Sequence, residues 1–269
     1  MLRRECRAIC SRWIVGRRRQ ALRKCHHIFT LRRNPPRQGF RRRIIFVRRV
    51  PWWGVVSSLA APLLLMGGWT LAAAVQPVPF DSVVLTISDL AALDTPHRWL
   101  MTSALIGVGL AHLTTAWALG CAATAGRVVL GLGGAATLLV AAFPLPSDGS
   151  SSSAHTATAA IAFLSLALWP WFAWNRPRVP RRTAPLLLGP AVSAAATVTL
   201  LMALALFVAE QFVSGQRVGL AERVAAGAQA LWPLAVVLSA RLSRPNLARD
   251  GAASDRPNLG TVPLDPGQT

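Results

Sequence analysis

The chain has 269 residues and a formal net charge of +19, yet only 14% of its residues are charged and 53% are hydrophobic. This composition argues against one or two soluble domains and favours a membrane protein. The four cysteines provide no disulfide framework, because three of them lie within the first 25 residues.

The positive charge is concentrated at the start of the chain. Residues 1–50 hold 17 of the 29 basic residues against a single acid, Glu5, whereas the rest of the chain is nearly balanced. This arginine-rich leader has no apolar periodicity, so we expect it to be disordered. Its arginines could attract anionic lipid, each contributing about 1 kcal/mol near the membrane surface. Nucleic acid, which so basic a segment can also bind, is the less favoured partner.

The leader has two further interpretations, of which the second is disfavoured. Translation could begin nearer Val47 or Val50, in which case residues 1–50 come from an over-extended gene start. The spacing of Cys6 and Cys10, followed by Cys25 and two histidines, faintly resembles a zinc site. The segment lacks the tight turns between paired ligands that such sites use, and its arginines would repel a dication, so we expect neither a metal nor a cofactor.

Six apolar segments follow, each a candidate membrane span. A helix needs about 20 largely apolar residues to cross the hydrocarbon core of a bilayer. In lipid the backbone must satisfy its own hydrogen bonds, so the spans are predicted to be helices. The third span is short unless Arg127 snorkels and lets it extend back to Cys121. The predicted spans are 53–75, 99–119, 128–143, 154–174, 186–209 and 224–240.

These segments predict an all-α, polytopic membrane protein with six transmembrane helices in one bundle, residues 51–240. Residues 241–269, rich in Pro, Gly, Asp and Asn, predict a disordered tail. An alternative reading takes Ala72–Ala74 as a signal-peptide cleavage site. The first apolar segment is longer than a signal core, which favours a retained anchor.

The loop charges predict the orientation of the bundle. Basic residues in short loops favour the cytoplasmic side of a membrane. The leader, Arg127, the loop 175–185 with its four arginines and the tail all fall on one side of a six-span arrangement. The acidic loop 76–98 falls on the other. Both termini are therefore expected in the cytoplasm.

Polar groups inside a span are costly, and each is a functional candidate. His112 is predicted roughly 20 Å below the outer surface, from a rise of about 1.5 Å per residue. We expect it to be a packed histidine bonded to a neighbouring helix. Gln229 is the second such residue, in the last span beside Trp232-Pro233.

The predicted outer face carries the other candidates. Asp89, His97, Arg98 and His155 fall in outer loops or at span ends, where they could bind a lipid head group, a cation or a protein. The alternative is that these residues have no binding role and the loops are hydrophilic because they face water. No ligand pair has a recognised metal spacing, and the motifs of serine nucleophile elbows and phosphate loops are missing, so no catalytic residue is assigned.

Several segments together resemble a known family. They are the segment from Thr86 that reads Thr-Ile-Ser-Asp-Leu-Ala-Ala, Trp99-Leu-Met-Thr, Ala142-Phe-Pro-Leu-Pro with His155 beyond, and Glu222-Arg-Val-Ala-Ala with Ala228-Gln-Ala-Leu-Trp-Pro-Leu. The combination resembles the bacterial six-span family catalogued as domain of unknown function 998 (DUF998), over about residues 53–240. The resemblance implies six membrane helices and brings no catalytic residues. A loop serine and the histidine opening the fourth span are also distantly similar to the Frag1/DRAM/Sfk1 membrane family, some of whose members are linked to lipid organisation.

Three functions follow as hypotheses. The first is a non-enzymatic protein that binds or organises lipid at the outer leaflet. The second is a small transporter or channel subunit, against which the scarcity of charged groups in the spans argues. The third is a membrane-embedded enzyme that modifies lipid, with His97 and His155 as acid and base. Heavy use of Arg, Ala, Gly and Pro with a single Lys suggests a GC-rich, bacterial genome, and the expected location of the protein is the bacterial plasma membrane. The expected partner is the lipid bilayer, and the sequence identifies no protein partner.

Overall fold

Six long helices make up most of the protein that the computed structural model describes, namely residues 50–147, 152–174, 185–213 and 215–243. All six are long and apolar enough to span a membrane, and the described residues form no strand. The predicted all-α, six-span architecture is therefore confirmed. The predicted leader and tail lie outside the described residues. The helices are α3 (Trp52–Ala74), α4 (Trp99–Ala118), α5 (Thr124–Ala142), α6 (Ser153–Ala173), α7 (Pro190–Val213) and α8 (Val218–Leu242).

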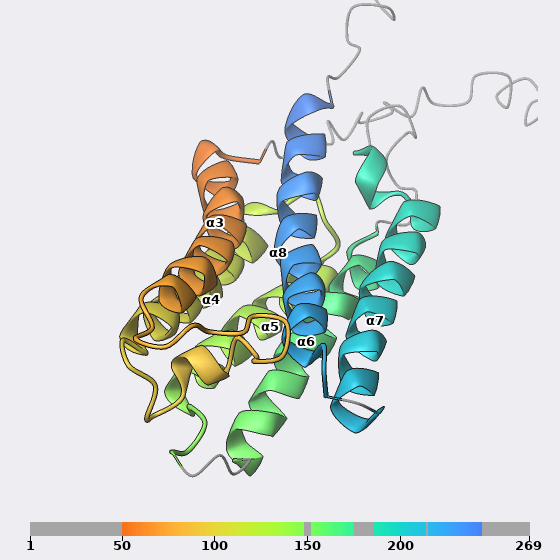
Figure 1. The fold of residues 1–269 in the computed structure, drawn as a ribbon. Helices are drawn as coiled ribbons and strands as arrows, with labels where there is room; N and C mark the ends of the chain where they lie inside the picture. Colours follow the sequence, from red (N-terminus) through yellow and green to blue (C-terminus); the bar gives the residue numbers. More distant parts are fainter. Residues whose placement is uncertain (1–49, 148–151, 175–184, 214, 244–269) are drawn as a thin grey trace, which may run out of the picture. The chain divides into compact units, whose positions relative to one another are not determined.

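The helices pack in a closed ring. Each packs against the next one along the chain, and α8 returns to pack against both α3 and α7 (Figure 1). Because the six helices alternate in direction, the start of α3 and the end of α8 lie at one end of the bundle. The long connection 75–98 lies at the other end, which we call the loop end.

Three predicted span boundaries need correction. The fifth span begins at Pro190 rather than 186, because residues Leu186–Leu188 form a separate 3-10 turn. The third begins at Thr124 and includes Arg127, whose guanidinium reaches back to the carbonyl oxygens at the end of α4 at 2.9 and 3.1 Å. This is the snorkelling that the extended third span required.

The sixth span shows the largest difference. It begins at Val218 rather than 224, so Glu222 and Arg223 lie inside a helix instead of in an outer loop. The hydropathy pattern placed the start of the span after the charged pair Glu222 and Arg223. The helix begins earlier because backbone groups of its first turn form hydrogen bonds with the loop 75–98. The change places a carboxyl group in the interior of the bundle.

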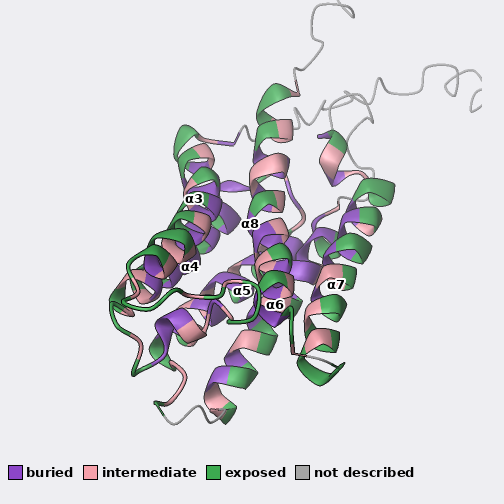
Figure 2. Ribbon diagram, in the orientation of Figure 1, coloured by how far each residue is buried: buried purple, intermediate pink, exposed green. Residues whose placement is uncertain are grey.

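The outer surface of the bundle is apolar and the interior holds small residues. Large side chains such as Trp117 and Phe212 are 79% and 85% exposed, as expected where the surrounding medium is lipid. Figure 2 shows exposed residues along the outward faces of the helices. Small residues allow close contact between α4 and α5. A methyl group placed on Gly134 would lie 2.8 Å from the Gly109 carbonyl oxygen, which leaves no room for a side chain there.

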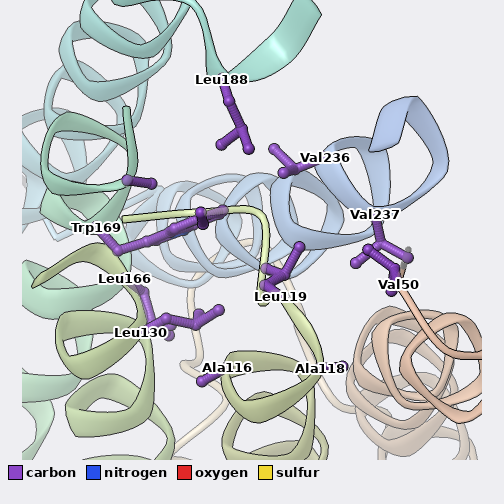
Figure 3. Packing of buried hydrophobic residues seen from close by; sticks show 12 residues of the cluster. Val50, Ala116, Ala118, Leu119, Leu130, Leu166, Trp169, Leu188, Val236 and Val237 are labelled. Carbon is purple, nitrogen blue, oxygen red and sulfur yellow. The ribbon is translucent and has the colours of Figure 1, made fainter. Parts of the chain in front are cut away.

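Two apolar clusters fill the interior. One lies toward the loop end and includes Ile87, Leu90 and Met101. The other lies toward the opposite end, where Trp169 of α6 converges with Leu119 after α4 and with side chains of α8 (Figure 3). The polar groups described below lie between the loop end and this second cluster, which we call the Trp169 cluster.

Candidate functional site

The connection 75–98 folds back onto the first turn of α8. The backbone N–H of Gly219 donates to the Val84 carbonyl at 3.2 Å, and that of Leu220 donates to the Val83 carbonyl at 3.0 Å. The first N–H groups of a helix have no partner within the helix, so the loop satisfies them. A side chain on Gly219 would overlap the Leu85 carbonyl, so glycine is required at this contact.

Arg223 fixes the same loop from the other side. Its Nη1 donates to the carbonyl oxygens of Ser82 and Leu85 at 2.9 and 2.8 Å and to Gly219 of its own helix at 2.9 Å. The guanidinium also lies 5.9 Å from the ring centroids of both Trp69 and Phe80, within the range of cation–π attraction. Arg223 therefore anchors the loop and does not face an open site.

Glu222 points into the bundle beside this anchor. It is only 4% exposed, and its Oε2 accepts a hydrogen bond from the backbone N–H of Ile87. A buried carboxyl group is tolerated where it is hydrogen-bonded, and here the loop supplies the donor. The acid thus joins α8 to the segment Thr86–Asp89 of the loop.

Asp89 organises that segment. Its Oδ2 accepts hydrogen bonds from the Thr86 N–H at 2.7 Å and from the Thr86 hydroxyl at 2.8 Å. In return the Asp89 N–H donates to the Thr86 oxygen at 3.1 Å, and the Thr95 hydroxyl donates to the Asp89 carbonyl at 2.6 Å. Both of these bonds use the same carboxylate oxygen, Oδ2.

His155 reaches the segment from the first turn of α6. Its Nδ1 lies 2.8 Å from the Phe143 carbonyl oxygen and its Nε2 lies 3.1 Å from the Ser88 hydroxyl. A carbonyl oxygen only accepts, so Nδ1 carries a proton, and in the neutral ring Nε2 accepts from Ser88. The histidine therefore ties the loop, α6 and the end of α5 together.

A groove of about 890 Å³ opens beside these groups, between α6 and α7. Its polar end is at the loop end and is formed by Thr86, Ser88, Asp89, His155 and Glu222. Its walls are apolar side chains of the two helices, and Phe163 and Phe207 meet across it with ring centroids 5.4 Å apart. No arginine or lysine is among the described residues that line it.

The predicted site residues divide into three places. Asp89 and His155 line the groove together. His97, an exposed residue with a φ of 57°, and Arg98 precede α4 and do not line it. His112 and Gln229 lie deeper and face an interior cavity. The groove is therefore built without two of the four residues expected at the outer face.

The expected hydrogen bond of His112 to a neighbouring helix is wrong. The residue is 1% exposed, and neither ring nitrogen has a partner among the described residues. Gln229 does bridge helices, since its Nε2 donates to the Phe163 carbonyl at 3.1 Å. Its Oε1, like the ring of His112, is left without a partner.

Sequence reasoning missed Glu222, Ser88 and Thr86 as site residues. All three fall within segments that carry the family resemblance, which was the available signal. Spacing alone could not find them, because Glu222 lies more than 130 residues from the loop that it contacts. Among the described residues, no group of three or more His, Cys, Asp or Glu side chains could hold a metal ion.

Residues 58–239 match the model of a protein family described as "Protein of unknown function (DUF998)". The matched range contains every residue of the groove named above. No curated protein and no solved structure matches the chain. The distant similarity to the Frag1/DRAM/Sfk1 family is not confirmed by these comparisons and stays a prediction.

Proposed function

The chain belongs to the DUF998 family and is an integral membrane protein, and from this premise we propose that it binds a single membrane lipid in the groove between α6 and α7. The observation that carries the proposal is the division of the groove into a polar end and apolar walls. A lipid has the same division. Its head group would meet Asp89 and His155 while its acyl chains lie against the phenylalanines of the two helices.

The charge of the polar end favours one class of head group. Asp89 presents a carboxylate to the groove, Glu222 lies behind it, and no basic side chain among the described residues lines the groove. Arg223 is close in sequence but is turned toward Trp69 and Phe80. An anionic phosphate alone would be repelled, whereas the ammonium group of an aminophospholipid would be attracted. We therefore propose an ammonium-bearing lipid as the ligand.

The loop charges favour the outer leaflet as the source of this lipid. The polar end of the groove lies at the loop end, where the connection 75–98 carries Asp81, Asp89 and Asp94. Acidic connections are expected outside the cell under the rule that basic loops stay inside. A protein in this orientation could retain or organise aminophospholipid in the outer half of the membrane.

Lipid binding by the purified protein tests the proposal. Binding of a fluorescent phosphatidylethanolamine and a fluorescent phosphatidylglycerol is compared for the parent protein and for Asp89→Asn. The asparagine keeps an oxygen that can accept from Thr86 but loses the charge. We expect a preference for the ethanolamine lipid that falls about 5- to 10-fold in Asp89→Asn, the effect of losing about 1–1.4 kcal/mol of attraction.

Two variants in α6 test whether the lipid occupies the groove, one inside the groove and one outside it. Ala160 and Ala157 are both exposed, but only Ala160 lines the groove. Ala160→Phe should fill the space and weaken binding of both lipids, whereas Ala157→Phe should leave binding unchanged. Equal binding by the parent, Asp89→Asn and Ala160→Phe would show that lipid does not occupy the groove.

One observation favours a second function, the modification of a lipid ester. The Ser88 hydroxyl lies 3.1 Å from Nε2 of His155, whose ring is held through Nδ1 by the Phe143 carbonyl. A histidine so held can take the hydroxyl proton, which makes Ser88 a candidate nucleophile. However, the acids Asp89 and Glu222 lie at the same end and would repel the oxyanion of an acyl transfer, so binding is the better supported function.

The two functions give different results with one variant. If the protein cleaves lipid, fatty acid is released from a bound ester lipid, and Ser88→Ala stops the release while binding continues. If it only binds, the parent protein releases no fatty acid, and Ser88→Ala changes binding no more than the loss of one hydrogen bond allows.

A further inference from the structure

A second, smaller cavity lies deeper among the helices, next to the groove. Its volume is about 70 Å³, and most of the side chains that line it are apolar. The polar groups in its wall come from separate parts of the chain: Ser88 of the loop, His112 of α4, Thr137 of α5, and Glu222 and Gln229 of α8. Polar residues from four parts of the chain thus line one small cavity.

Three buried polar atoms at this cavity have no partner. They are both ring nitrogens of His112 and Oε1 of Gln229, and each of these residues is only 1% exposed. A neutral imidazole always has one nitrogen that donates and one that accepts, so both must find a partner or cost free energy. The cavity has room for several water molecules that would supply these partners, since one water needs roughly 10–15 Å³ of such volume.

The cavity and the groove share a wall. Ser88, Phe163 and Glu222 line both spaces. Glu222 and Gln229 are seven residues apart, which places them on the same face of α8 and about 10 Å apart along its axis. A line of polar groups therefore runs from the groove, past Glu222, to Gln229 and His112.

The end of the cavity away from the groove adjoins the Trp169 cluster. Leu166 lines the cavity and also belongs to the Trp169 cluster, so the cavity ends where that cluster begins. The cluster is apolar and includes Leu119, Leu130 and Val236 as well as Trp169, each at most 1% exposed (Figure 3). Apart from the indole N–H of Trp169, which donates but does not take up a proton, the buried residues of this cluster carry no polar side-chain atom.

We infer that the cavity is a one-sided, water-filled proton well, in which protons enter from the groove past Glu222 and bind to the imidazole of His112. A proton from water in the groove is taken up by the Glu222 carboxylate and passes along the cavity waters. It forms an N–H bond at the unprotonated ring nitrogen of His112, which becomes imidazolium, and it leaves by the reverse path. The Trp169 cluster prevents its passage to the far side of the membrane.

Few titratable side chains near His112 could carry the proton in its place. His112 and Glu222 are the titratable side chains among the described residues of the cavity wall. Asp89 and His155 face the groove on the far side of Glu222. Arg127 of α5 lies at the opposite end of the bundle and bonds to carbonyl oxygens at the end of α4. The inference does not depend on what the groove binds.

Solid-state NMR of ¹⁵N-histidine-labelled protein in lipid vesicles tests the inference, with the His112 signals assigned by their loss in His112→Asn. We expect the His112 ring to be in contact with water, to exchange its N–H with deuterium added to the bath, and to become imidazolium as the bath pH is lowered. In Glu222→Gln the water contact should persist, while exchange slows at least tenfold. A dry His112, or exchange at an unchanged rate in Glu222→Gln, overturns the proton path.

A matched pair in α8 tests the cavity itself. Ala226 and Ala228 are both half-buried, but only Ala226 lines the cavity. Ala226→Leu should remove the water contact of His112, and Ala228→Leu should preserve it. Vesicles with the parent protein should leak protons no faster than empty vesicles. Water contact that survives in Ala226→Leu contradicts the location of the well, and a proton leak contradicts its closed end.

Discussion

Glu222 and Arg223 are neighbours in sequence, but their side chains have different surroundings. Arg223 lies near the rings of Trp69 and Phe80 and donates to the carbonyl oxygens of the loop. Glu222 turns inward, accepts the Ile87 N–H and lines both the cavity and the groove. The neighbouring pair therefore both fixes the loop 75–98 and places an acid where the two spaces meet.

The Glu222–Ile87 hydrogen bond predicts how substitutions at residue 222 affect stability. Glu222→Ala leaves the buried Ile87 N–H without a partner and should lower the free energy of unfolding by about 1–3 kcal/mol. Glu222→Gln keeps an oxygen acceptor and should lower it less. Unfolding in detergent micelles, followed by circular dichroism, measures both. Limited proteolysis should cut the connection 75–98 faster in Glu222→Ala.

The control for this measurement is Gln216→Ala, which changes an exposed residue just before α8. It should leave both the unfolding free energy and the rate of cutting unchanged. If alanine and glutamine at residue 222 destabilise the protein equally, the hydrogen bond to Ile87 does not hold the loop.

At the scale of the helices, the sequence was sufficient to predict their number and type. Apolar runs of about 20 residues have few other structures open to them in lipid. It was not sufficient for their ends, because partners elsewhere in the chain decide where a helix begins. The first turn of α8 is stabilised by the carbonyl oxygens of Val83 and Val84, more than 130 residues earlier. The predicted span consequently started six residues too late.

The candidate site was predictable only in part, for the same reason. Asp89 and His155 stood out as polar residues near span ends, and both line the groove. His97 and Arg98 stood out equally, but the fold directs them elsewhere. Glu222 was hidden because its role depends on a tertiary contact with Ile87, which no local pattern encodes.

Close packing of α4 against α5 predicts that two glycines three residues apart respond differently. A methyl group on Gly134 would lie 2.8 Å from the Gly109 carbonyl oxygen, whereas one on Gly131 would lie 3.8 Å from its nearest neighbour. Gly134→Ala should therefore lower the free energy of unfolding by about 1–3 kcal/mol, the usual result of overpacking. Thermal unfolding in micelles measures the change.

Gly131→Ala is the matched control on the same helix. It should be neutral, or stabilising by up to about 1 kcal/mol, because alanine is the better helix former. A destabilisation by Gly131→Ala as large as that by Gly134→Ala would mean that the glycines serve some purpose other than the contact between α4 and α5.

At the scale of the whole molecule, the two ends of the bundle differ in structure. The loop end carries the acidic connection 75–98 (Figure 1), the polar end of the groove and the polar groups that lead to His112. The opposite end is filled by the Trp169 cluster and carries Arg127, which bonds to the end of α4. Whatever the groove binds, this asymmetry implies that the groove is reached from the side of the membrane at which the loop end lies.

The orientation of this asymmetry can be measured by labelling single cysteines in a variant that lacks the native ones. Asp94 at the loop end and Arg241 at the end of α8 are both exposed, so a cysteine at either position should react when a reagent reaches it. Since basic connections are held in the cytoplasm, a membrane-impermeant thiol reagent should label Asp94→Cys in intact cells and Arg241→Cys only after the cells are opened. The reverse pattern would place the groove and the proton well on the cytoplasmic side, and the lipid would then have to come from the inner leaflet.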